Sequence, residues 1–452
     1  MTAKLSVSRS LSRLLINRSY AFLWGGQAVS SLGDSIYNLT LIVWIAAEIA
    51  RQADGQPTTW APIAVSGVLV AVALPSLLFG SIAGVFVDRW DKKRTMLWMD
   101  FLRMLLVALL ILVSGSSFFP WKPTVTVQLS AIYATVFLTS VCSQFFTPAR
   151  ATLIRDLVDK KQLGRASGLA QVSQSIALIM GPPLAAPVLF SVGVQWALLF
   201  NALTFLVSFL CIQAIRVERT AKNGDKAGQA NFGREFLEGM TFFFKNRVLQ
   251  VLFVTVIVAS LGAGAINSLM IFFVTQNLHV AVTYVGLLDG FFGVGVIVGA
   301  ILVSAISSKL EITWLFVVSI LGFGILFLLL ARTTNVFVAF SILLLLGLAQ
   351  VTINITIVPM VLGIVPREMV GRVMGTLNPV GVLATLISVS LAGYLSSDLF
   401  ANIHGSLLGF VFGPIDTIFT LSALLFLISG FYALVRLRPS FSSSSVEQEA
   451  TS

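Results

Sequence analysis

The chain has 452 residues, of which 57% are hydrophobic and 11% are charged, and its formal net charge is +10. Soluble domains carry about 25% charged residues, so this composition excludes a water-soluble globular protein. A transmembrane helix needs about 20 apolar residues, and the apolar runs here are long and lack the alternation of β-barrel strands. We therefore predict an all-α polytopic membrane protein.

The reactive residues are few. The chain has two cysteines, Cys142 and Cys211, and two histidines, His279 and His404. These counts argue against a disulfide framework, a zinc site and a histidine proton relay, so we expect no metal and no cofactor. No GxxxxGK[ST] segment for ATP is present, and transport energy would have to come from an ion gradient or from the substrate.

The apolar stretches predict twelve spans. The first follows a basic segment but is too long for a signal peptide, so we expect it to be retained. The predicted spans are 20–47, 61–87, 95–115, 126–146, 166–190, 194–215, 249–276, 283–307, 312–330, 335–360, 373–396 and 408–435.

Lysine and arginine predict the orientation. All but four of the 29 basic residues fall in segments that are cytoplasmic if the N-terminus is inside; the exceptions are Arg51, Lys122 and Arg332 in outer loops and Arg103 within the third span. By the positive-inside rule, both termini face the cytoplasm of a cell (inner) membrane. The basic surface predicts anionic lipids of the inner leaflet as partners, rather than nucleic acid.

The chain divides into two halves around a polar segment. Phe232, Phe236, Met240 and Phe243 in that segment predict an amphipathic helix on the inner surface. The predicted parts are a cytoplasmic segment 1–19, a six-helix bundle 20–215, a linker 216–248, a second six-helix bundle 249–435 and a disordered tail 436–452.

A short internal match supports duplication. Gly164-Arg165-x-x-Gly168 opens the fifth span and Gly371-Arg372-x-x-Gly375 opens the eleventh, 207 residues later. Two related six-helix halves with a central substrate site are a transporter design.

Several segments resemble a known family. Gly84-x-x-x-Asp88-Arg89, continued by a basic run to Arg94, resembles the loop 2–3 motif of the major facilitator superfamily, and Gly181-Pro182 partly resembles its antiporter motif. The stretches 25–34 and 145–153 are similar to the branch that contains bacterial macrolide-efflux proteins and the enterobactin exporter. The resemblance implies the major facilitator fold and a proton-driven exporter whose two bundles rock around a midplane site.

Asp34 is the first candidate for the mechanism. It lies near the middle of the first span, where a charged carboxylate costs about 2.5–3.5 kcal/mol. Gln27, Ser31, Asp34 and Asn38 follow a 4-3-4 spacing that places them on one helix face, which we expect to line the substrate cavity. Asp34 would carry a proton or bind a cationic substrate; alternatively it fixes packing through an interhelical hydrogen bond.

Asp289 in the eighth span is the second candidate. It shares a small-residue face with Gly286, Gly293 and Ala300, so we expect its carboxylate to look into the bundle. The alternative is a wetted acid in an outer vestibule.

The loop 2–3 motif predicts a gate. An acid can bind the positive N-terminal end of a neighbouring helix and pair with an arginine in one conformation only. The alternative is a solvated charge cluster. The predicted gating residues are Gly84, Asp88, Arg89, Lys93, Arg94, Asp100, Arg103 and Arg150.

Within that set, Asp100 and Arg103 lie one turn apart, and an (i, i+3) pair partly neutralises itself. Arg150 follows Pro148, where we expect a break in the helix, and would be an anchor or a gate at the inner mouth. Gly181-Pro182-Pro183 should also break its helix, as a static kink or a moving hinge.

The remaining cavity candidates suit a large, mainly apolar substrate: Phe145, Asn267 and Asn354. We predict a monomeric transporter, not an enzyme, that exports amphipathic small molecules of the drug or macrolide type in exchange for protons. Export of a siderophore or lysolipid, import of a sugar or amino acid, and sodium coupling remain alternatives. An intramembrane enzyme using Asp88-x-x-Asp91 is disfavoured because the flanking residues are basic and no second acidic cluster follows.

Overall fold

The computed structural model describes residues 16–449, apart from 52–57, 116–122, 160–161, 216–245, 307–310, 367–369, 401–404 and 408–409. The predicted amphipathic helix in the linker, with Phe232, Phe236, Met240 and Phe243, lies outside the described residues.

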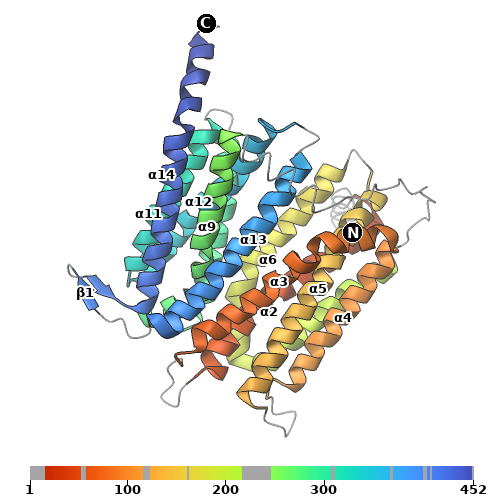
Figure 1. Ribbon diagram of the computed structural model, residues 1–452. Helices are drawn as coiled ribbons and strands as arrows, with labels where there is room; N and C mark the ends of the chain where they lie inside the picture. Colours follow the sequence, from red (N-terminus) through yellow and green to blue (C-terminus); the bar gives the residue numbers. More distant parts are fainter. Residues whose placement is uncertain are drawn as a thin grey trace, which may run out of the picture. The chain divides into compact units, whose positions relative to one another are not determined.

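The chain is built from long helices (Figure 1). The first half contains α2 (Arg18–Trp44, extended by the π-helical turn η1, Ile45–Ile49), α3 (Ala61–Arg89), α4 (Lys92–Leu112), α5 (Val125–Leu157), α6 (Leu163–Val192) and α7 (Val194–Ala214).

The second half has the same character and adds a small hairpin. It contains α9 (Arg247–Phe272, with η3, Phe273–Asn277), α10 (Tyr284–Ile306), α11 (Ile312–Arg332), α12 (Val336–Leu362), α13 (Val370–Tyr394, with η4, Leu395–Leu399), the antiparallel strands β1 (Gly405–Leu407) and β2 (Phe410–Phe412), and α14 (Pro414–Glu449).

Twelve of the described helices are long and apolar enough to cross a membrane, which confirms the predicted all-α polytopic fold. Most of their ends lie within a few residues of the predicted ones. The twelfth span begins at Pro414 rather than 408, because the residues before it form the β1–β2 hairpin.

The chain forms two compact units. One comprises residues 1–49 and 71–226, and the other comprises 50–70 and 227–452. The first turns of α3 therefore belong to the second unit. There the backbone N–H of Ile63 donates to Ser397 Oγ at 3.3 Å, and Gly393 approaches Ser66 closely.

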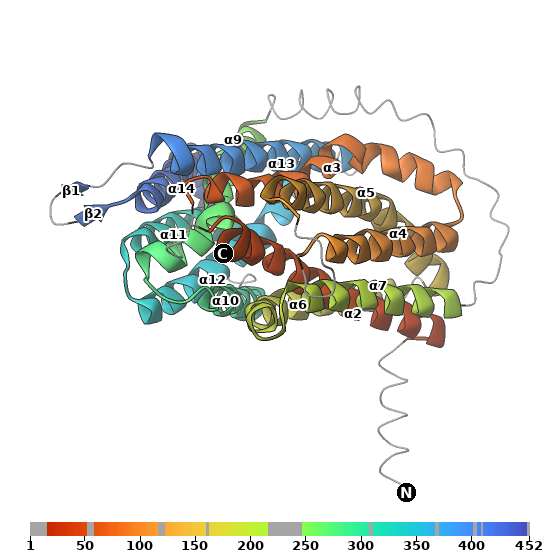
Figure 2. The same ribbon diagram turned by 90° about the horizontal axis from the view of Figure 1, so that it is seen from below.

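Four helix pairings recur in the two units. In the first unit α2 packs on α6 and α7, and α4 packs on α5 and α7; in the second α9 packs on α13 and α14, and α11 packs on α12 and α14. Figure 2 shows α2, α6 and α7 side by side. When the six spans of each half are numbered in chain order, span one packs on spans five and six, and span three packs on spans four and six. This repeated pattern agrees with an internal duplication.

Three predictions of local structure are wrong. The α5 helix continues through Pro148, and α6 continues through Pro182 and Pro183, so neither helix breaks there. Inside packed spans, neighbouring groups can satisfy the carbonyl that a proline leaves free. The tail predicted to be disordered from residue 436 is helical as far as Glu449, and α14 projects beyond its neighbours in the unit (Figure 1). Extending an existing helix costs far less than starting one.

Glycines allow the helices of the first unit to approach closely. A Cβ added at Gly33 of α2 would overlap the Thr204 hydroxyl and lie 2.7 Å from Asn201 Oδ1 on α7. A Cβ at Gly181 of α6 would overlap Ser35. These contacts place polar residues of α7 directly against α2.

We predict that Gly33→Ala destabilises the protein by about 1–3 kcal/mol, the usual cost of overpacking. Gly25→Ala, on the same helix with nothing within 4 Å of the new methyl group, is the matched control. Alanine is the better helix former, so the control should be neutral or stabilising. Thermal unfolding in detergent measures both, and equal melting temperatures for the two variants would contradict the packing argument.

Candidate functional site

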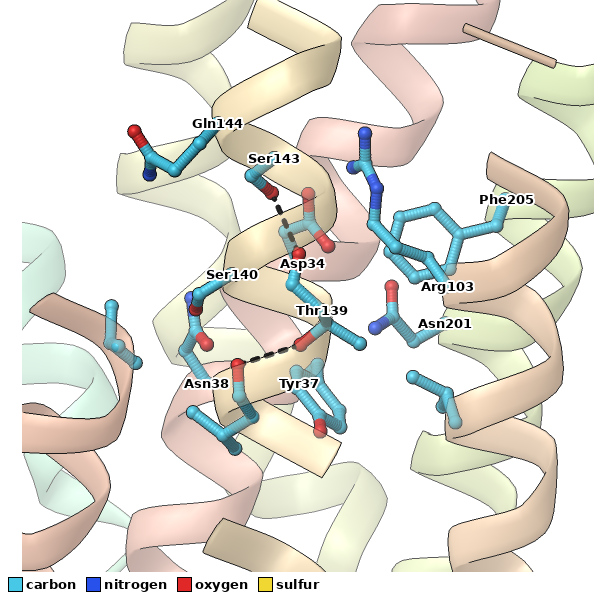
Figure 3. Close-up of a pocket in the computed structure, with 13 residues that line it drawn as sticks. Asp34, Tyr37, Asn38, Arg103, Thr139, Ser140, Ser143, Gln144, Asn201 and Phe205 are labelled. Atoms are coloured by element: carbon cyan, nitrogen blue, oxygen red, sulfur yellow. Dashed lines mark hydrogen bonds between the residues drawn. The ribbon is translucent and has the colours of Figure 1, made fainter. Parts of the chain in front are cut away.

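A cavity of about 210 Å³ lies within the first unit (Figure 3). Its walls come mainly from α2, α4, α5 and α7. The lining residues are Asp34, Tyr37, Asn38, Val72, Arg103, Val107, Val136, Thr139, Ser140, Ser143, Gln144, Asn201 and Phe205.

Asp34 is half-buried and lines this cavity. The charges of Arg103 and Asp100, both on α4, act on its carboxyl group. Asn201 of α7 is fully buried and lines the same cavity. Asp34 therefore shares this cavity with one basic residue, Arg103, as Figure 3 shows.

Arg103, which lines the cavity, forms an ion pair with Asp100. Arg103 Nη2 lies 3.4 Å from Asp100 Oδ1, and the two side chains are 6% and 0% exposed. The guanidinium carbon of Arg103 stands 4.4 Å from the centre of the Phe146 ring and 5.1 Å from that of Phe205. Cation–π contacts such as these stabilise a desolvated cation.

A chain of hydrogen bonds leads to this ion pair from Arg150. Arg150 Nη1 donates to Gln27 Oε1 at 3.3 Å, Gln27 Nε2 donates to Ser208 Oγ at 2.9 Å, and the Ser208 hydroxyl donates to Asp100 Oδ2 at 2.6 Å. Every donor points toward Asp100, which suits an ionised carboxylate. The chain ties α5, α2, α7 and α4 together.

The polar face predicted for the first span is divided between two spaces. Asp34 and Asn38 line the cavity described above, whereas Gln27 and Ser31 line a much smaller one beside Arg150. A regular helical spacing places residues on one face, but neighbouring helices decide which of them share a space.

The loop 2–3 motif stabilises helix ends. Asp91 caps α4 by accepting from the backbone N–H of Arg94 at 2.8 Å, and Lys93 Nζ donates to the carbonyls of Gln213 and Ile215 at 2.9 and 2.7 Å. A lysine at these terminal carbonyls satisfies orphan acceptors and favours the negative end of α7.

Two other positions of the motif, Asp88 and Gly84, provide no structural evidence for a gate. The side chain of Asp88 lies outside the described part of the chain, and a Cβ added at Gly84 would meet nothing within 4 Å. The gating role of the motif stays a prediction.

The other predicted cavity residues do not line this space. Phe145 stacks on Trp90, with ring centroids 5.8 Å apart. In the second unit, Asp289 is half-buried on α10, Asn267 donates to the Ala263 carbonyl at 3.2 Å, and Asn354 accepts from Gln350 at 3.5 Å. Their functional roles remain predictions.

Sequence reasoning missed the hydroxyl-bearing wall on α5. Thr139, Ser140, Ser143 and Gln144 recur at helical spacing within one span, and this periodicity was the available signal. The sequence analysis placed Arg103 in a self-neutralising pair and in the predicted gate. It did not place Arg103 beside Asp34, because that proximity arises from tertiary packing.

Comparison with known proteins decides the family. The family model described as transmembrane secretion effector, a branch of the major facilitator superfamily, matches residues 11–449. The chain belongs to this family. It is therefore a multi-pass membrane transporter rather than an enzyme, in the branch that includes macrolide-efflux proteins.

Relatives of this transporter are distant in sequence. It is 24% identical over 400 residues to the MFS-type transporter YkuC of Bacillus subtilis, covering 86% of this chain and 87% of that one. It is 26% identical to macrolide efflux protein A of Streptococcus pyogenes, covering 67% and 70%. A putative bacilysin exporter, BacE of Bacillus subtilis, is 29% identical over 45% of this chain and 48% of its own.

Solved structures share the fold. The nucleoside transporter NupG has a TM-score of 0.71 at 12% identity and covers 93% of this chain and 99% of its own. A bacterial homologue of the iron transporter ferroportin, in its inward-facing state, has a TM-score of 0.70 at 14% identity over 93% and 98%.

We predict that Arg103→Gln destabilises the transporter by about 3–5 kcal/mol, because it leaves Asp100 as an uncompensated buried charge. Adding Asp100→Asn removes that charge, so the double variant should recover most of the loss. Thermal unfolding of the two single variants and the double variant gives the coupling energy. Purely additive effects would show that the pair does not act as a unit.

Proposed function

We propose that this transporter exports amphipathic small molecules of the drug or macrolide type, by alternating access and in exchange for protons. The observation that carries the proposal is Asp34, a carboxylate that lines a cavity whose walls are membrane-spanning helices. The relatives named for macrolide efflux and bacilysin export support the outward direction.

The exchange follows from electrostatics. An ionised Asp34 within the span is costly, and either a proton or a bound cation offsets that cost. Because both neutralise the same carboxylate, each excludes the other. A site that binds the substrate on one side of the membrane and a proton on the other couples the two fluxes.

The proposal extends to the two bundles, the termini, α6 and Asp289, as the predicted topology arranges them. We propose that the bundles 20–215 and 249–435 alternate access with both termini in the cytoplasm, and that Gly181 and Pro182 contribute flexibility to α6 without breaking it. Asp289 would serve as a second acid in the second bundle.

We predict that Asp34→Asn abolishes substrate-dependent proton movement. In inside-out vesicles acidified by respiration, a pH-sensitive dye would report collapse of the gradient when a macrolide, a lipophilic cation or a siderophore-like compound is added. Asp398→Asn, which removes an exposed acid of η4, is the control and should behave as wild type.

The alternatives give different results in that assay. Collapse that survives Asp34→Asn would move the proton role to Asp289, which the Asp289→Asn variant then tests. No response to any compound, with folded protein and a normal gradient, would contradict proton-coupled export of these substrates.

We also propose that anionic lipid headgroups bind where α3 meets α4. A groove of about 600 Å³ there is lined by Arg89, Arg94, Trp90 and Trp98, all of them exposed. Basic residues beside tryptophan are typical of a membrane interface that faces anionic lipid.

We predict that the Arg89→Gln/Arg94→Gln variant loses most of the thermal stabilisation that phosphatidylglycerol gives to the wild type. Each basic residue near an anionic surface contributes about 1 kcal/mol. Phosphatidylcholine, which is zwitterionic, is the control lipid and should affect both proteins equally. Undiminished stabilisation of the variant by phosphatidylglycerol would place the lipid elsewhere.

A further inference from the structure

Arg103 has hydrogen-bonding capacity that the protein does not use. Its side chain is 6% exposed and lines the cavity beside Asp34. Nε and Nη2 are both buried and make no hydrogen bond; the 3.4 Å approach of Nη2 to Asp100 Oδ1 is an ion-pair contact only. Buried donors without acceptors cost about 1–3 kcal/mol each, more when charged.

The groups that contact Arg103 leave these donors without a hydrogen bond. Asp100 Oδ2 already accepts from Ser208, and Asp100 Oδ1 makes no hydrogen bond. Phe146 and Phe205 contact the guanidinium and carry no hydrogen-bond acceptor. A ligand oxygen in the cavity would supply Arg103 with a hydrogen bond that neither Asp100 nor the two rings makes.

The charges around the cavity do not cancel. Asp34 and Asp100 are set against Arg103, which leaves one negative charge in excess. Arg150 is the next basic group along the hydrogen-bond chain, but it lines the separate small cavity and donates to Gln27. A ligand with one net positive charge neutralises this excess, whereas a zwitterion leaves it in place.

The α5 wall adds acceptors rather than donors. The hydroxyl of Thr139 donates to the Val136 carbonyl at 3.0 Å, and that of Ser143 donates to the Thr139 carbonyl at 3.2 Å (Figure 3). Their protons are used within the helix, so both oxygens offer lone pairs to the cavity. Together with Asp34 they favour a ligand that donates hydrogen bonds.

These observations identify a class of ligand, and the inference rests on the proposed function of the same site. We propose that the cavity binds a monocation that carries a neutral oxygen acceptor beside its ammonium group, as in an amino alcohol or an amino amide. The ammonium group pairs with Asp34, and the neutral oxygen accepts from Arg103. Arg103 is then a specificity-determining residue of the substrate site.

Calorimetric binding to the purified full chain in detergent tests this assignment with three probes. Propranolol is a lipophilic amino alcohol, its deoxy analogue lacks only the hydroxyl group, and tetraphenylphosphonium is a monocation without an acceptor. The wild type should bind propranolol about tenfold more tightly than the deoxy analogue, the size expected for one hydrogen bond to a charged group.

The matched variant is Asp100→Asn/Arg103→Gln. It removes both members of the ion pair, keeps one excess negative charge on Asp34, and avoids leaving an unpaired buried charge. It should bind tetraphenylphosphonium as the wild type does and bind propranolol and its deoxy analogue equally. Arg103→Lys, which keeps the charge but loses the planar fork of donors, should also reduce the discrimination.

Equal binding of propranolol and its deoxy analogue by the wild type would overturn the inference, and so would discrimination that persists in the double variant. Proton release in weakly buffered solution separates this inference from the proposed function. Discrimination without proton release supports the role of Arg103 and contradicts proton exchange at Asp34. Tetraphenylphosphonium binding with proton release but no discrimination supports the exchange and contradicts the role of Arg103.

Discussion

The stability of the first unit depends on a buried ion pair, Asp100–Arg103, whose two charges compensate each other inside a membrane-spanning bundle. Asp100 and Arg103 are both almost fully buried, and removing either would strand a charge in a medium that solvates it poorly. Ser208, Gln27 and Arg150 extend the pair across four helices. Helix packing in lipid gains little from burying apolar surface, so such polar contacts and the close approach at Gly33 specify which helices meet.

The sequence was sufficient to predict the twelve spans, because a run of about twenty apolar residues is typical of a transmembrane helix. The structure contains all twelve among its described residues. The sequence was also sufficient to single out Asp34, since an acid within a span stands out. It failed at Pro148 and Pro182, where packed neighbours tolerate a missing donor. It could not separate Gln27 from Asn38, because that division depends on the helices packed around α2.

The loop 2–3 motif between α3 and α4 makes structural contacts that the spacing of its residues does not predict. Lys93 binds the last carbonyls of α7, and Asp91 caps the first turn of its own helix. Both contacts fix the end of α4, the helix that carries Asp100 and Arg103. These contacts therefore anchor one end of the helix that supplies the ion pair.

The helix α3 is common to both compact units, since its first turns count with one and the remainder with the other. One continuous helix therefore supplies residues to both units. Pro75 lies five residues beyond the boundary and removes one backbone hydrogen bond at that point. The α3 helix is therefore less stiff beside this boundary than a helix with a complete set of backbone hydrogen bonds.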